Sequence, residues 1–177
     1  MRVAVLALLG VTLCACSRRV PAYSPPRQYV MPTGAEPASG VRVLHMSDPQ
    51  AAYSVVSGVL DVGNPEGDGY KWTTDSAQFE FMAGDLSHSS LYMHYIANGD
   101  TMRETGPLKI SIDVDGKPFD SFVQADAGEH DYRHAAGAIA TQPGKTLVVT
   151  VRIEPPFVAK GDGQKLGVLL QSIGFAD

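Results

Sequence analysis

Cysteine is scarce in this 177-residue sequence: Cys14 and Cys16 are its two cysteines, and both precede position 17. The chain beyond Cys16 therefore cannot form an internal disulfide. Basic residues are also few, since 14 Lys+Arg stand against 19 Asp+Glu and give a formal net charge of −5. A nucleic-acid-binding domain normally carries a basic face. We therefore predict no nucleic-acid partner.

Long hydrophobic runs are lacking as well. The apolar stretch over residues 3–13 has 11 residues, whereas a helix needs about 20 to cross the hydrocarbon core of a bilayer. The stretch follows the positively charged Arg2, and a charged start before a short apolar run is the layout of a secretory signal peptide. We expect residues 1–15 to be such a signal.

The apolar run ends in Leu13-Cys14-Ala15-Cys16-Ser17, which resembles the lipobox of bacterial lipoproteins. The resemblance implies cleavage after Ala15, a diacylglycerol on the Cys16 thiol and a membrane partner held through that lipid. Each buried methylene contributes ~0.8 kcal/mol, and one acyl chain alone binds only marginally, so several chains together anchor firmly. Ser17 implies, by analogy with lipoprotein sorting, the outer membrane facing the periplasm. The alternative is an ordinary signal peptide with incidental cysteines.

The rest of the chain divides into a tether and one domain. Residues 16–40 hold five of the 12 prolines, and proline removes amide donors and favours extended backbone. We interpret residues 16–40 as a proline-rich tether and residues 41–177 as a folded domain of ordinary size.

From residue 41 onward the hydrophobic pattern has a period of two, and no apolar run has helical spacing. The clearest unit is 108–114, which alternates apolar and polar residues and leads into Asp115-Gly116, a hairpin-turn signal. Further strands are expected over residues 41–46, 53–61, 77–81, 91–97, 119–123, 146–153 and 166–175. Eight or nine short strands predict an all-β fold, an antiparallel β-sandwich. A jelly roll is the preferred topology and an immunoglobulin-like sandwich the alternative.

Three segments resemble a jelly-roll accessory domain of bacterial glycan-related proteins. Residues 70–74 (YKWTT) leading into 77–81 resemble the start of a strand in that domain, and 163–175 resemble its closing strand. The hairpin at 114–118 fits its strand order. The resemblance covers roughly residues 58–175 and implies the fold and a glycan-related setting, while an activity does not follow from the fold.

Aromatic residues make up 8% of the sequence, with Trp72 the single tryptophan. Exposed rings stack on the apolar face of a sugar, whereas buried rings fill β-cores. Tyr70 and Trp72 are therefore candidate ligand-binding residues, with packing as the alternative. Tyr92 and His94 share one face of an expected strand and are candidates to line a groove, the alternative being one layer of a two-sided strand.

The densest ionisable cluster is residues 129–134 (EHDYRH). Its spacing is similar to the HExxH pattern of zinc proteases, which requires a helix. In the strand expected here, His130 and His134 would share a face at a separation of about 13 Å. We therefore predict no metal site. Asp113, Asp115 and Asp120 are interpreted as a solvated rim, although sandwich loops of this kind sometimes hold Ca²⁺.

No motif of a known catalytic nucleophile, phosphate loop or dinucleotide site occurs after residue 16. We therefore predict a non-enzymatic protein without a cofactor. The expected function is a lipid-anchored cell-envelope module that binds glycan or assists polysaccharide-related processes. The alternative is a structural lipoprotein that docks another envelope protein.

Overall fold

The computed structural model describes residues 43–63, 69–82, 84–142 and 144–177. The predicted signal peptide, the Cys16 lipidation site and the tether lie outside the described residues. Within the described ranges, no helix is long and apolar enough to cross a membrane.

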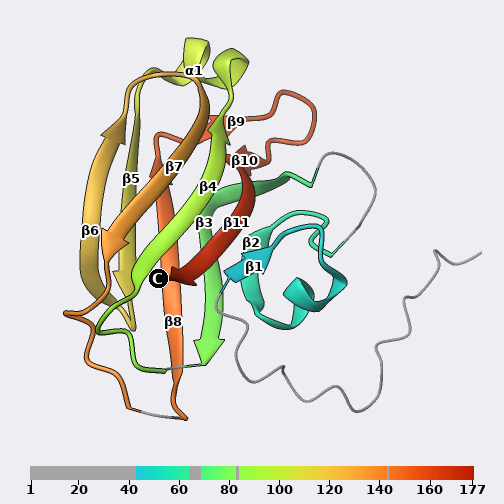
Figure 1. Cartoon of the computed structure of the whole chain (residues 1–177). Helices are drawn as coiled ribbons and strands as arrows, with labels where there is room; N and C mark the ends of the chain where they lie inside the picture. The colour runs from blue at the N-terminus through green and yellow to red at the C-terminus, as the bar shows by residue number, and fades with distance from the viewer. Residues whose placement is uncertain (1–42, 64–68, 83, 143) are drawn as a thin grey trace, which may run out of the picture. The chain divides into compact units, whose positions relative to one another are not determined.

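Nine antiparallel strands form two layers that face each other (Figure 1). Sheet A has the order β1-β11-β4-β7, and sheet B has the order β2-β3-β8-β5-β6. The strands of sheet A are β1 (Val43–His45), β11 (Leu169–Ala176), β4 (Ser90–Ala97) and β7 (Gly128–Ala135). Those of sheet B are β2 (Val55–Val59), β3 (Lys71–Met82), β8 (Thr146–Glu154), β5 (Leu108–Val114) and β6 (Lys117–Gln124). The start of β3 also pairs with β11, which joins the layers at one corner.

The strand pairings are nested. Without β2, the first strand (β1) pairs with the last (β11), β3 pairs with β8, β4 with β7, and β5 with β6. A long hairpin folded over on itself gives this order, and it is the order of a jelly roll. The structure thus confirms the predicted antiparallel β-sandwich and shows its jelly-roll version rather than the immunoglobulin-like one.

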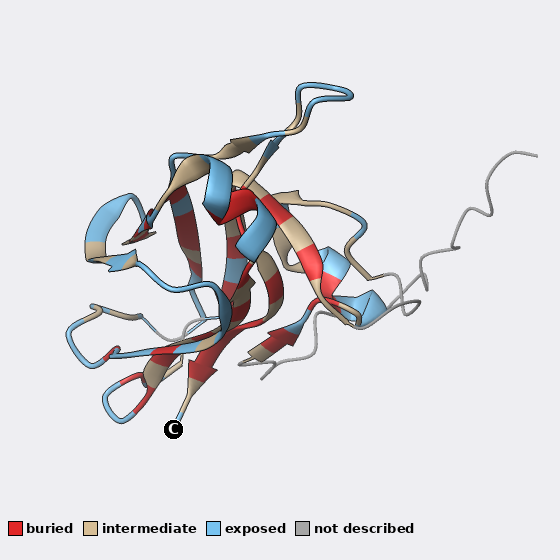
Figure 2. Ribbon diagram, turned by 90° about the horizontal axis from the view of Figure 1, so that it is seen from above, coloured by how far each residue is buried: buried red, intermediate tan, exposed pale blue. Residues whose placement is uncertain are grey.

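The core lies between the sheets and is filled by alternate residues. Leu108, Ile110 and Ile112 on β5 are at most 2% exposed, and the same holds for the inward residues of β8. Figure 2 shows the alternation of buried and less buried residues along the strands. Each buried aliphatic side chain contributes about 1.5–3 kcal/mol, so the period-two pattern is the main source of stability.

The predicted hairpin turn forms at Asp115 and Gly116. Their φ angles are 51° and 74°, which is the left-handed backbone that a two-residue hairpin turn requires. The Asp115 carboxylate accepts a hydrogen bond from the Val148 amide at 2.9 Å, so the turn is attached to β8 as well. Asp113 pairs with Arg152. Asp113 and Asp115, which were predicted to belong to a solvated rim, therefore both make specific contacts.

Two short helices were not predicted from the sequence. A short helix, α1 (Gly99–Thr105), follows β4; Asn98 caps it by accepting from the amides of Asp100 and Thr101. A second short turn of helix, η1 (Pro49–Tyr53), precedes β2. Both helices are too short to show an apolar period.

The predicted closing strand over residues 166–175 is interrupted. Residues 165–166 form β10 (Lys165–Leu166), which pairs with β9 (Phe157–Val158), and β11 starts only at Leu169. Gly167 lies at the break, where a Cβ would come within 2.6 Å of the Thr73 hydroxyl and 2.7 Å of the Thr74 carbonyl. Only glycine fits at this position, because the backbone passes too close to β3 for any side chain.

Candidate functional site

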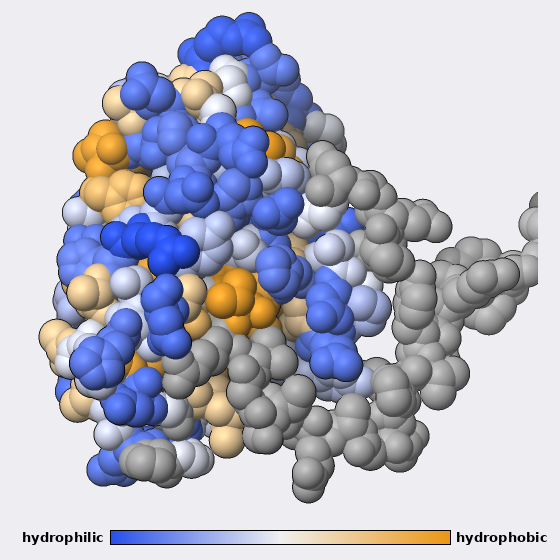
Figure 3. All heavy atoms as spheres, viewed as in Figure 1, coloured by the Kyte–Doolittle hydropathy of each residue, from blue (hydrophilic) through white to orange (hydrophobic). Residues whose placement is uncertain are grey.

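The outer face of sheet A carries the side chains of β4 and β7 that do not enter the core. Tyr92 and His94 on β4 lie opposite Arg133 and Asp131 on β7. Viewed as in Figure 1, the described surface in Figure 3 is predominantly hydrophilic, with a few separate hydrophobic residues. This face therefore presents polar groups on two paired strands.

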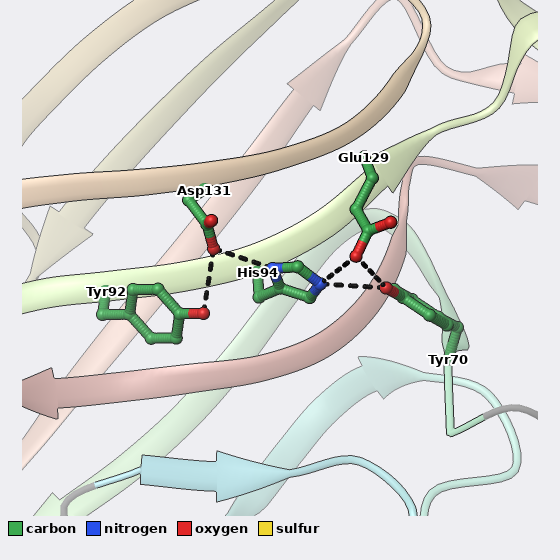
Figure 4. A network of polar contacts seen from close by, with 5 residues as sticks. All are labelled: Tyr70, Tyr92, His94, Glu129 and Asp131. Carbon is green, nitrogen blue, oxygen red and sulfur yellow. Dashed lines mark hydrogen bonds and ion pairs between the residues drawn. The ribbon is translucent and has the colours of Figure 1, made fainter.

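His94 lies at the centre of a polar network on this face (Figure 4). Its Nδ1 is 2.7 Å from Asp131 Oδ1, and its Nε2 is 2.8 Å from Glu129 Oε1. The His94 side chain is 14% exposed, whereas the two carboxylates are 62% and 61% exposed. Each ring nitrogen of His94 therefore faces a carboxylate oxygen at hydrogen-bond distance.

Two tyrosines complete the network. The Tyr92 hydroxyl donates to Asp131 Oδ1 at 2.9 Å, and the Tyr70 hydroxyl donates to Glu129 Oε1 at 3.0 Å. Tyr70 immediately precedes β3, and its hydroxyl also lies 2.9 Å from His94 Nε2. The Arg133 guanidinium lies over the Tyr92 ring, 4.9 Å from its centroid, in a cation–π contact. Side chains from three separate segments thus converge on one imidazole.

The network changes the protonation behaviour of its members. Hydrogen bonds from His94 and then Tyr92 lower the pKa of Asp131 below its ordinary value. Burial, followed by the hydrogen bond to Asp131, raises the pKa of Tyr92. Near neutral pH, Asp131 is therefore a carboxylate and Tyr92 a neutral phenol that donates to it.

The structure brings together three of the four candidate ligand-binding residues. Tyr70, Tyr92 and His94 belong to the network of Figure 4, while Trp72 does not. Trp72 is half-buried where the two sheets join, and its backbone pairs with Leu169. Trp72 thus lies apart from the other three candidates, and its role in ligand binding stays a prediction.

Sequence reasoning missed the roles of Glu129 and Asp131, which it treated only as part of an ionisable cluster. Strand alternation over 128–135 would have placed both carboxylates on one face. It could not have shown that this face borders His94, because the register between β4 and β7 is not encoded locally.

The other face of β7 points toward β6. His130, Tyr132 and His134 share this face, as the predicted strand requires, and Tyr132 is 8% exposed. The Tyr132 hydroxyl donates to Asp120 Oδ2 at 2.8 Å, and His134 Nδ1 lies 2.9 Å from the same oxygen. Asp120 on β6 is therefore held by two side chains of β7 in the other sheet, and the prediction that it belongs to a solvated rim was wrong.

Partial burial by itself would raise the pKa of Asp120. Hydrogen bonds from Tyr132 and the Ser121 amide, together with the charge of His134, lower this pKa by more than burial raises it. The net result is a pKa below the ordinary value. Burial raises the pKa of Tyr132, and the hydrogen bond to Asp120 and the charge of that carboxylate raise it as well. In the described part of the chain, no three His, Cys, Asp or Glu side chains are placed to hold a metal ion.

Comparison with known proteins identifies no family. No protein-family model matches the chain, and no curated protein matches it. Among solved structures, the chain is similar to a family GH115 4-O-methyl-α-glucuronidase with specificity for decorated arabinogalactans. The TM-score is 0.46 and the identity 9%, over 77% of this chain and 17% of the enzyme.

The chain is also similar to an exo-β-1,3-galactanase from Phanerochaete chrysosporium, solved with β-1,3-galactotriose. Here the TM-score is 0.40 and the identity 15%, over 78% of this chain and 29% of the enzyme. The chain spans less than a third of the length of either protein. The jelly-roll assignment rests on the strand pairings and not on these similarities.

Proposed function

We propose that this chain is a lipid-anchored module of the bacterial cell envelope that binds glycan without catalysing a reaction. The observation that carries the proposal is the His94-centred network on the outer face of sheet A, with Tyr70, Tyr92, Glu129 and Asp131 around it. The anchor rests on the resemblance of residues 13–16 to a lipobox. The proposed location is the outer membrane, facing the periplasm.

The network suits the recognition of a polyhydroxylated ligand. Its two carboxylates are well exposed, yet each is held in orientation by a tyrosine and by His94. Groups that are ordered before binding lose less conformational freedom when a ligand arrives. The tyrosine rings add apolar area beside the polar groups, and a sugar presents both kinds of surface.

The protonation state of Asp131 does not suit it as the acid of a glycosidase. A glycosidase needs one carboxyl group with a raised pKa to act as the acid. Hydrogen bonding instead lowers the pKa of Asp131. Tyr92 has a raised pKa and donates to Asp131, so it is no base near neutral pH.

Binding of the detergent-solubilised full chain to a glycan array tests the proposal. The wild-type chain is expected to bind a defined subset of glycans, and His94→Ala to reduce that signal at least tenfold because both carboxylates lose their common partner. Trp72→Phe, outside the network, is the matched control and should keep binding. Equal binding by wild type and His94→Ala would remove this surface from the function.

The anchor is tested separately. Cys16→Ser is expected to move the protein from the membrane fraction to the soluble periplasmic fraction, because no acyl chain can be attached. Crosslinking in intact cells examines the alternative function: a single protein partner captured through the outer face of sheet A, with no glycan bound on the array, would replace the glycan proposal.

A further inference from the structure

The sequence contains two asparagines, Asn64 and Asn98. Asn64 precedes Pro65, whose nitrogen carries no hydrogen. Asn98 precedes Gly99, which has an N–H and no side chain to obstruct a reaction at that nitrogen. The backbone nitrogen that follows an asparagine can attack the side-chain amide. Asn98 is therefore the one asparagine of this chain at which such an attack can occur.

The Asn98–Gly99 peptide joins the end of β4 to the start of α1 (Figure 1). Gly99 is exposed and Asn98 is half-buried. In the described part of the chain, the nearest atom to a Cβ built on Gly99 would be the Ala127 Cβ, at 3.5 Å. Water, which the second step of the reaction needs, therefore reaches this peptide.

Four hydrogen bonds fix the conformation of Asn98 in the folded chain. Its Oδ1 accepts from the amides of Asp100 and Thr101, at 2.9 and 3.1 Å. Its backbone oxygen accepts from the Met102 amide at 3.0 Å and from the Thr101 hydroxyl at 2.9 Å. The side chain and the backbone of Asn98 are thus both held by the first turn of α1.

This conformation is closed to the attack. The product is a planar five-membered ring, so the Gly99 nitrogen must lie in the plane of Cα, Cβ and Cγ of Asn98. The ψ angle of Asn98 is 125°, which turns the Gly99 nitrogen far out of that plane. Rotation about ψ also turns the Asn98 carbonyl away from the Met102 amide. The ring can therefore close only after the start of α1 has opened.

We propose that Asn98 is a self-modification site controlled by α1: the chain deamidates at Asn98 when α1 opens and stays intact while the cap is formed. The Gly99 nitrogen bonds to Asn98 Cγ, and the side-chain nitrogen leaves as ammonia and takes the proton of Gly99 with it. Water then opens the resulting succinimide at either carbonyl and gives aspartate or isoaspartate.

The two products affect the fold differently. Aspartate is a good capping residue and can accept from the same two amides. Isoaspartate adds a methylene to the backbone between β4 and α1, so the four bonds of the cap cannot all form again. The modification thus leaves a permanent mark on chains in which the end of β4, the strand of Tyr92 and His94, has opened.

Peptide mass spectrometry of the full chain tests the proposal, after incubation in mildly alkaline buffer with detergent and in the same buffer with concentrated guanidinium chloride. The peptide that contains Asn98 should gain the mass difference between an amide and a carboxyl group at least tenfold more slowly in the native chain, because only opened molecules react. Equal rates in the two buffers would overturn the control by α1. No mass gain in either buffer would overturn the site.

Arg103→Gly and Arg103→Ala form a matched pair. Arg103 is an exposed residue of α1, and both variants lose its ion pair with Asp100. Glycine has the lower helix propensity, so Arg103→Gly should open α1 more often and deamidate about fourfold faster under native conditions. Equal native rates for the two variants would overturn the control by α1.

Asn98→Ser identifies the reacting residue. Serine keeps a capping side chain and has no amide, so this variant should gain no mass in either buffer. A mass gain in Asn98→Ser equal to that of the wild type would overturn the assignment to Asn98. The guanidinium arm of the experiment does not require the variant to fold.

Discussion

The two faces of β7 carry similar residues and have different roles. The outward face holds Glu129 and Asp131 around His94, with both carboxylates largely exposed. The inward face holds Tyr132 and His134 around Asp120, and there the Tyr132 ring stacks on Phe122 with centroids 4.9 Å apart.

Both faces join a histidine, a tyrosine and a carboxylate. The inward set bridges β6 and β7, which belong to different sheets; its Tyr132 is 8% exposed and its Asp120 side chain 25% exposed, although His134 is 45% exposed. In the outward set the carboxylates of Glu129 and Asp131 are 61% and 62% exposed, and His94 is 14% exposed. The exposure of the carboxylates rather than residue type thus separates a group that closes the sandwich from a group that is available to a ligand. Substitutions on the inward face should change stability, and those on the outward face should change binding.

The largest effect is expected for Tyr132→Ala on the inward face. The variant loses a buried ring and leaves Asp120 without one of its donors, and aromatic-to-alanine changes in a core cost about 3–5 kcal/mol. Urea unfolding measures the loss in the free energy of unfolding. Tyr132→Phe keeps the ring and should cost only about 1 kcal/mol. Equal losses for the two variants would show that the hydrogen bond, not the packing, closes this edge.

On the outward face, Asp131→Asn should reduce glycan binding about tenfold and change the free energy of unfolding by less than about 1 kcal/mol. Exposed ion pairs contribute little to stability, whereas the carboxylate is one of the two outward acceptors. Titration calorimetry with an array-identified glycan and urea unfolding measure the two quantities. A large loss of stability with unchanged binding would reverse the roles assigned to the faces.

Acid should lower the stability of the folded domain through Asp120. The folded-state pKa of Asp120 lies below its ordinary value of 3.8, so the unfolded chain binds more protons as the pH falls. The stability contributed by Asp120 is therefore complete well above pH 4 and is lost below it. Asp120→Asn should flatten the fall in stability between about pH 5 and pH 2. Urea unfolding across that range checks this, and an unchanged slope would contradict it.

The smallest effect is expected for Tyr92→Phe. The variant removes one of the hydrogen bonds that lower the pKa of Asp131, so this pKa should rise toward its ordinary value while stability changes by about 0.5 kcal/mol or less. Carboxyl titration by NMR measures the shift. Tyr53→Phe, at an exposed position outside the network, is the control and should leave the Asp131 titration unchanged.

Local patterns in the sequence predict much of the fold. The alternation of Leu108, Ile110 and Ile112 identifies a half-buried strand, and Asp115-Gly116 identifies its turn, because both signals lie within a few residues of each other. The interruption at Gly167 could not be predicted, since it depends on the approach of Thr73, more than 90 positions earlier.

The candidate site was predicted only in part for the same reason. The pairing of Tyr92 and His94 on one face follows from alternation within a single strand. The contact of Tyr70 with His94 spans 24 positions, and its bond to Glu129 spans 59. Such contacts depend on strand order and register, which a period-two pattern leaves open.

The nested pairing of the strands has a consequence for how the domain is made. Val43 on β1 lies opposite Gly174 on β11, so sheet A contains a pairing between residues about 130 positions apart. Such distant contacts form slowly, because the entropy of closing the loop must be overcome before the contact stabilises anything. The strands β5 and β6, by contrast, are neighbours in the sequence, so their pairing closes only a short turn. Sheet A, and with it the support beneath His94, remains incomplete until β11 has left the ribosome.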